Sequence, residues 1–154
     1  MKRYKQNDMQ TNEIRDPVLL IRTLADFRYE MRRFYQFSEQ AALSAGVQPR
    51  QYQLLLQVAA ASTHETVTIA YLAERLGLKH NSTVELVDRS EHEGLVARFE
   101  DSADRRRTIL RVTRKGHQLM NKLAGQHARE LNEVAPRFIQ ALEDIRSHAL
   151  QEAE

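Results

Sequence analysis

Residues 68–94, "TIAYLAERLGLKHNSTVELVDRSEHEG", contain the clearest structural pattern in the sequence. Thr68 is a favourable N-cap, and apolar residues recur behind it at helical spacing until Gly77, which is typical of a short helix. A second helix begins near residues 80–82 and ends at Gly94. Two helices joined by a short turn that contains glycine form a helix-turn-helix motif, so we predict this motif here.

Two segments with a two-residue period follow Gly94. In "LVARFE", Leu95, Ala97 and Phe99 alternate with Val96, Arg98 and Glu100. In "RTILRVT", Thr108, Leu110 and Val112 lie on one side. The polar residues "DSADRR" join the two segments, which predicts a β-hairpin. A hairpin behind a helix-turn-helix is the wing of a winged helix, a fold whose second motif helix can enter the major groove of DNA.

Long helices are predicted on both sides of this segment. Pro17 behind Asp16 begins an amphipathic helix that lasts until Gly46. Pro49 begins the next helix, which ends in the polar "STHET". The apolar face that we predict for it consists of Tyr52, Leu55, Leu56 and Ala59.

The helical period returns after the hairpin. Thr113 is predicted as the N-cap of the next helix, and Pro136 predicts a break or a kink, so we expect two C-terminal helices. The order is four helices, a hairpin and two helices. The fold class is therefore mainly α with a small β-hairpin wing.

Length and composition narrow the class of protein. The 154 residues suit one domain, and 42% hydrophobic with 29% charged residues is ordinary for a globular chain. No apolar run approaches the roughly 18 residues of a membrane span, and the first residues lack the apolar stretch of a secretory signal. We therefore expect a cytoplasmic protein that does not bind membranes. The absence of cysteine excludes disulfides and thiol-based sensing.

The positive charge is concentrated at the hairpin. The net charge of the chain is only +2. Residues 98–115 hold seven basic and three acidic side chains, a net +4, whereas residues 116–154 hold four basic and six acidic ones, a net −2. Three consecutive arginines, Arg105–Arg107, form the centre of this cluster at the expected hairpin tip. Such a run is usually a solvated face, but its position favours a contact with a polyanion.

The start of the second motif helix is rich in hydrogen-bonding side chains. These are Lys79, His80, Asn81, Ser82 and Thr83, and Val84, Leu86 and Val87 follow as the predicted packing face. Asparagine can pair with adenine in two places, serine and threonine can reach bases or phosphates, and a helix N-terminus attracts phosphate. The pattern indicates a DNA-binding helix.

Residues 69–116 resemble the multiple-antibiotic-resistance regulator (MarR) family of winged-helix transcription factors. "STVELVDRSEHEGLVAR" is similar to that family's recognition helix and first wing strand. "DRRRTILRVTRKG" is similar to its wing signature, through Asp104, Arg106, Val112, Thr113 and Gly116. The order of helices outside this segment is also similar. One departure is Ser90, where the family usually has an apolar residue, and we expect slightly looser packing there.

The resemblance implies DNA-contacting residues. Arg106 would enter the minor groove, Asp104 would hold the wing tip in shape, and Arg89 would contact the DNA backbone. The implied DNA-binding set is Lys79, His80, Asn81, Ser82, Thr83, Glu85, Arg89, Asp104, Arg105, Arg106 and Arg107. Helix 80–94 would read the major groove and wing 98–112 the minor groove.

The resemblance also implies an assembly and a mode of regulation. The chain would be a single MarR-type domain, 1–154, with a helical dimerisation region, 16–48 and 116–152, and a DNA-binding region, 49–115. The homodimer would place two recognition helices about 34–36 Å apart on a palindromic operator. It would act as a repressor that a small aromatic or phenolic ligand releases. Candidate ligand-binding residues are Arg28, Arg32, Tyr35 and His64.

Other classes of function have less support in the sequence. No pair among the six histidines has a known metal-ligand spacing, and neither a glycine-rich phosphate loop nor a nucleophile elbow is present. We therefore predict no metal, no cofactor and no enzymatic activity. The alternative is a non-catalytic winged-helix module that binds protein or RNA. Exposed aromatic residues or methionine at the start of the second motif helix would favour that alternative, but polar residues stand there.

Overall fold

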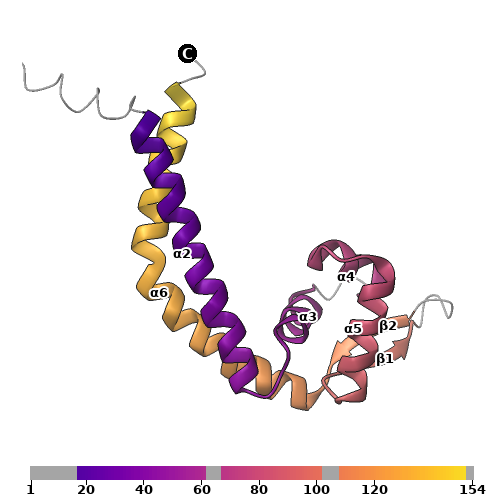
Figure 1. Cartoon of the computed structure of the whole chain (residues 1–154). Coiled ribbons are helices and arrows are strands. Elements are labelled where there is room, and N and C mark those ends of the chain that lie inside the picture. Colours follow the sequence, from indigo (N-terminus) through magenta and orange to yellow (C-terminus); the bar gives the residue numbers. More distant parts are fainter. Residues whose placement is uncertain (1–16, 62–66, 102–107, 152–154) are drawn as a thin grey trace, which may run out of the picture. The chain divides into compact units, whose positions relative to one another are not determined.

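The computed structural model describes residues 17–61, 67–101 and 108–151, in the element order α2, α3, α4, α5, β1, β2 and α6 (Figure 1). The described residues form two compact units. Residues 38–127 form one, which we call the winged unit, and residues 17–37 with 128–151 form the other, which we call the helix-pair unit.

The winged unit contains five complete elements. They are α3 (Pro49–Ala60), α4 (Ile69–Leu76), α5 (His80–His92), β1 (Val96–Glu100) and β2 (Thr108–Val112). The end of α2 (Pro17–Ser44) and the beginning of α6 (Arg114–Gln151) also belong to it. Helices with one small hairpin confirm the predicted fold class, a winged helix-turn-helix that is mainly α-helical.

Glycine and threonine set the helix boundaries of the motif as predicted. The Thr68 hydroxyl accepts a hydrogen bond from the backbone N–H of Tyr71 at 3.2 Å, which caps α4. Gly77 ends α4 with a φ of 62°, and Gly94 follows α5 with a φ of 72°. Both values lie in the left-handed region, where glycine is favoured because it has no Cβ atom.

The core of the winged unit lies between α3, α4, α5 and the hairpin. Its fully buried side chains include Leu54, Leu55, Leu72 and Val87. The buried face of α3 differs in part from the prediction: Tyr52 and Leu55 are buried, but Leu56 is only half-buried and Ala59 is exposed. Gln51, Leu54 and Val58 complete that face.

Tyr52 and His127 pack together in the same core. Their ring centroids are 4.9 Å apart, and burial raises the pKa of the Tyr52 phenol above its ordinary value. The ring nitrogens of His127 form hydrogen bonds of 2.7 Å with the Leu123 carbonyl and with the Ser38 hydroxyl. These contacts hold the ends of α2 and α3 and the first part of α6 together within the winged unit.

The hairpin is antiparallel, with Val96 opposite Val112 and Arg98 opposite Leu110. Paired residues share one face of a sheet, so Val96, Leu110 and Val112 face the core while Phe99 faces outward. Phe99 is 45% exposed, and the Arg111 guanidinium lies over its ring at 5.2 Å from the centroid. The alternation in "LVARFE" grouped Phe99 with Leu95 and Ala97. In the structure, Phe99 lies on the outer face of the hairpin.

The C-terminal segment is a single helix, so the prediction of two helices is wrong. α6 spans 38 residues and contains Pro136, whose missing N–H removes one backbone hydrogen bond without ending the helix. Val134 is buried just before the proline and Phe138 packs against Phe27 just after it. Packing on both sides of Pro136 therefore stabilises the helical path.

α6 begins as predicted, with Thr113 as its cap. The Thr113 hydroxyl donates to the carbonyl oxygen of Gly94 at 2.6 Å and accepts from the backbone N–H of Gly116 at 3.1 Å. Gly116 is buried, and a Cβ atom on it would lie 2.3 Å from the Leu95 carbonyl oxygen. Only glycine therefore allows α6 to approach the hairpin this closely.

In the helix-pair unit, parts of α2 and α6 run side by side (Figure 1). Phe27 and Phe138 form an edge-to-face pair at 5.5 Å between centroids, and Arg137 binds Glu30 through two nitrogens at 3.0 and 3.2 Å. Several large apolar side chains of this unit are 40–64% exposed: Val18, Leu19, Ile21, Leu24, Tyr29, Tyr35, Leu131, Ile139 and Leu142. No helix over the described ranges is apolar enough along a sufficient length to span a membrane.

Candidate nucleic-acid interface

One side of α5 presents polar side chains to solvent. Lys79, His80, Asn81 and Ser82 at its start are exposed, as are Glu85 and Arg89 farther along. Lys79 is the N-cap, and its side chain forms no capping hydrogen bond. The first backbone N–H groups of α5 therefore remain open to an anion, and the helix dipole adds to this attraction.

Thr83 does not belong to the exposed side of α5, although the resemblance placed it in the DNA-binding set. Its side chain is 0% exposed, and its hydroxyl donates a hydrogen bond of 3.0 Å to the carbonyl oxygen of Lys79. A buried and satisfied hydroxyl cannot reach a base. Its spacing to Leu86, Val87 and Ser90, at three, four and seven residues, was the sequence signal for this burial.

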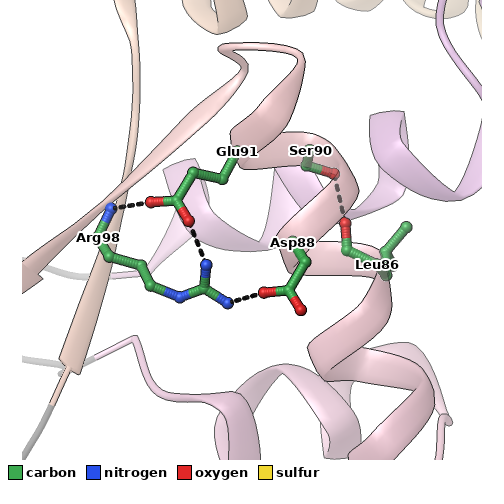
Figure 2. Close-up of polar contacts among 5 residues, drawn as sticks. All are labelled: Leu86, Asp88, Ser90, Glu91 and Arg98. Carbon is green, nitrogen blue, oxygen red and sulfur yellow. Dashed lines mark hydrogen bonds and ion pairs between the residues drawn. The ribbon is translucent and has the colours of Figure 1, made fainter.

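The opposite side of α5 packs into the core. Leu86 and Val87 are buried there as predicted, whereas Val84 of the predicted packing face is only half-buried and Ser90 is buried as well. The Ser90 side chain is 0% exposed and its hydroxyl donates to the Leu86 carbonyl at 2.8 Å (Figure 2). The serine that replaces an apolar residue is thus accommodated by a local hydrogen bond.

Arg98 of β1 joins the hairpin to α5. Figure 2 shows its guanidinium between the carboxylates of Asp88 and Glu91. Its backbone N–H also donates to Glu91 Oε1 at 3.1 Å. Burial lowers the pKa of Arg98, but the hydrogen bonds that its guanidinium donates to Asp88 and Glu91, with the attraction of their charges, outweigh this effect, so its pKa lies above the ordinary value.

The ion pairs of Arg98 remove one positive charge from the cluster that the sequence places near the hairpin. The sequence counts Arg98 among seven basic residues near the hairpin, yet its charge is balanced by two carboxylates of α5. Sequence reasoning missed this contact because Asp88, Glu91 and Arg98 become neighbours only when β1 packs beside α5. Arg98 therefore fixes the hairpin against α5.

A cavity of about 390 Å³ lies near the C-terminal end of α5. Its charged lining residues are Glu39, Arg50, Arg89 and Glu93. Two arginines and two glutamates balance each other, so the cavity by itself does not favour an anion. It does show that Arg89 borders a recess on the surface of the winged unit.

The predicted wing tip falls in the segment 102–107. Asp104, Arg105, Arg106 and Arg107 lie outside the described residues, as does His64 of the predicted ligand set. The other members of that set, Arg28, Arg32 and Tyr35, are exposed on α2. Thus the roles predicted for these residues stay predictions.

A second groove, of about 540 Å³, lies in the helix-pair unit. Phe27, Glu30, Pro136, Arg137 and Phe138 are among the residues that line it. Arg28, Arg32 and Tyr35 do not line it. Over residues 17–61, 67–101 and 108–151, no group of three potential metal ligands comes together.

Comparisons with known proteins agree with this geometry. A family model for the MarR family matches residues 45–107, which includes α3, α4, α5 and β1. A search of curated proteins found no match. Many solved structures share the fold, and three of them illustrate its range.

The first is AbsC, a MarR family transcriptional regulator from Streptomyces coelicolor, with 22% identity, a TM-score of 0.63, and coverage of 99% of this chain and 93% of AbsC. The second is Staphylococcus aureus MepR in complex with DNA, with 17% identity, a TM-score of 0.65, and coverage of 82% and 92%. The third is CouR from Rhodococcus jostii bound to p-coumaroyl-CoA, with 22% identity, a TM-score of 0.59, and coverage of 86% and 93%.

The family resemblance deduced from the sequence is therefore confirmed. The matched segment contains the helix-turn-helix, and the structural neighbours extend the similarity over nearly the whole chain. Residues 45–107 of this chain match the MarR family, and the chain has the fold of MarR family transcription regulators.

Proposed function

We propose that this protein is a homodimeric, sequence-specific DNA-binding transcription regulator. The observation that carries the proposal is the division of α5 into two sides. Leu86, Val87 and Ser90 anchor one side in the core, while His80, Asn81, Ser82 and Glu85 are exposed on the other. A helix held rigidly on one side and rich in hydrogen-bonding groups on the other suits readout of base edges in the major groove.

The hairpin supplies the second contact in this proposal. Arg98 fixes β1 to α5, and β1 is paired with β2 from Val96 to Glu100. The loop between these strands carries Arg105, Arg106 and Arg107, and we assign Arg106 to the minor groove and its neighbours to phosphates. MepR, which has the same fold, has been solved in complex with DNA, and this supports DNA binding by the fold.

The exposed apolar residues of the helix-pair unit support a homodimer. Ile21, Leu24, Ile139 and Leu142 are each at least 40% exposed on helices that have few buried side chains. Burial against a second copy would remove this apolar surface from water. We assign dimerisation to residues 16–48 and 116–152 and DNA binding to residues 49–115. Two recognition helices about one DNA turn, roughly 34–36 Å, apart would then read a palindromic operator.

Regulation by a small ligand completes the proposal. CouR, which has the same fold, has been solved bound to p-coumaroyl-CoA, a thioester of a phenolic acid. We therefore propose a cytoplasmic repressor, without enzymatic activity, that an aromatic or phenolic ligand releases from DNA. Such a ligand needs to favour the non-binding conformation by only about 1–3 kcal/mol.

The alternative, a protein-binding module, would require exposed aromatic or apolar residues at the start of α5. In the described part of the chain, that surface consists of lysine, histidine, asparagine and serine instead. No observation specifically favours the alternative.

The experiment is a titration of the protein with a duplex that contains the palindrome found upstream of its own gene, beside a scrambled duplex. We expect tighter binding to the palindrome, and an affinity that falls steeply with salt because phosphate contacts release counterions. Arg106→Ala should weaken binding markedly while the dimer remains intact by analytical ultracentrifugation. Equal affinity for both duplexes would contradict the proposed function, and unchanged binding by Arg106→Ala would contradict the assignment of the wing.

A further inference from the structure

Three acidic residues follow one another along α5 at three-residue steps, and two of them share a partner among the described residues whereas the third has none there. Asp88 and Glu91 are both bound to Arg98. Glu85 is exposed, and within the described ranges it forms neither a hydrogen bond nor an ion pair. Its carboxylate is therefore available to a ligand. No hydrogen bond or ion pair among the described residues gives Glu85 a role in stabilising the fold.

The position of Glu85 on the helix indicates what that ligand is. Asn81, Glu85 and Arg89 are spaced by four residues, so they form a row along one side of α5, and all three are exposed. The core-facing residues Leu86 and Val87 lie on the other side. If α5 enters the major groove, as the proposed function requires, Glu85 lies among the side chains that face base edges.

A carboxylate next to DNA is electrostatically unfavourable unless it meets a donor. It can only accept hydrogen bonds, and phosphates repel it. In the major groove, guanine presents the acceptors N7 and O6 and thymine presents O4, so both also repel it. Adenine offers the N6 amino group but places the acceptor N7 beside it. Cytosine offers the N4 amino group and has no second acceptor on its own major-groove edge.

We propose that Glu85 is a specificity-determining residue that accepts a hydrogen bond from the N4 amino group of a cytosine in each half-site. This inference rests on the proposed function and names one nucleotide base that the protein would recognise. The negative charge of Glu85 lowers the affinity of the protein for every DNA sequence. The hydrogen bond from cytosine offsets this loss of affinity, and it forms only at sites that contain the cytosine. Discrimination of this kind works by penalising the wrong partners.

The test is a binding selection from duplexes with a randomised half-site, followed by sequencing, for the parent protein, Glu85→Gln and Glu85→Ala. The parent should select a cytosine at one position, by about tenfold over other bases. Glutamine can pair with N6 and N7 of adenine, so Glu85→Gln should change the preference at that position alone to adenine. Glu85→Ala should bind there without preference.

The matched control is Glu93→Gln, because Glu93 is an exposed acid just behind α5 and its substitution changes the charge equally. It should leave every preference unchanged. If Glu85 serves only as a helix-surface partner of Arg89, Glu85→Gln will select the same bases as the parent, which would overturn the inference. If the parent itself selects no sequence, the proposed function fails instead, so the two failures are distinguishable.

Discussion

The two sides of α5 use the same kinds of residue for different purposes. On the side toward β1, Asp88 and Glu91 are bound to Arg98, and their charges are balanced within the protein. On the solvent side, Asn81, Glu85 and Arg89 are exposed, and among the described residues their side chains form no hydrogen bond or ion pair. Whether a polar residue on such a helix contributes to structure or to binding therefore depends on the partners of its side chain. The residue type alone does not decide it.

The same difference separates Thr83 from Ser82. These neighbours are both hydroxyl residues near the start of α5, yet Ser82 is exposed and Thr83 is fully buried. One step along a helix turns the side chain by about 100°, which is sufficient to move it from solvent into the core. The predictions below test whether the side facing the core and β1 carries stability and the solvent side carries binding.

The largest effect is expected for the core side of α5. Leu86 is 3% exposed, and Leu86→Ala removes its packing and leaves a cavity. We expect the free energy of unfolding to fall by about 2–5 kcal/mol, measured by urea denaturation. Leu78→Ala, at a half-buried leucine in the turn before α5, is the control and should cost less. A loss of less than about 1 kcal/mol for Leu86→Ala would contradict the assignment of this side to the core.

An intermediate effect is expected for Arg98. Arg98→Ala leaves Asp88 and Glu91 as two unpaired acids beside each other, but all three side chains are between 29% and 56% exposed, so solvent screens part of the loss. We expect a loss of about 1–2 kcal/mol in urea denaturation, together with faster amide hydrogen exchange in β1 and β2.

Arg98→Lys provides the control for that experiment. It keeps the positive charge but lacks the planar group that reaches two carboxylates at once, so it should recover only part of the stability. Hairpin amides that exchange as slowly in Arg98→Ala as in the parent would show that Arg98 does not fix the hairpin.

The smallest effect is expected for Thr83. Thr83→Val keeps the shape of the side chain and removes only the hydroxyl that donates to the Lys79 carbonyl, which still accepts from the Thr83 backbone N–H at 3.0 Å. We expect a loss of about 0.5–1.5 kcal/mol by thermal or urea unfolding and no change in the selected bases. A changed base preference would return Thr83 to the DNA-binding set.

Much of the fold follows from local signals in the sequence. Pro17 and Pro49 mark helix starts, and Gly77 and Gly94 mark helix ends, because each residue restricts or permits particular backbone angles. Pro136 misled because packing around Val134 and Phe138 outweighs its local cost. The contact between Phe27 and Phe138 joins residues more than one hundred positions apart, and the periodicity of a sequence gives no information about contacts at that separation.

The candidate site is only partly predictable for the same reason. The residue types at the start of α5 indicate DNA binding. The spacing of Thr83 from the buried residues Leu86, Val87 and Ser90 also indicates that Thr83 is buried. The ion pairs of Arg98 depend on how β1 packs beside α5, so they required the structure. Glu85 looks like its acidic neighbours in the sequence and differs from them only because they have a partner.

The most direct test of the account is the specificity ratio of Asn81→Ala. This ratio is the Kd for a scrambled duplex divided by the Kd for a site selected by the parent, and Gln53→Ala, an exposed amide of α3, is the control. We predict that the ratio for Asn81→Ala falls about tenfold or more, while the free energy of unfolding stays within about 0.5 kcal/mol of the parent. An unchanged ratio in an equally stable protein would show that the solvent side of α5 does not read DNA.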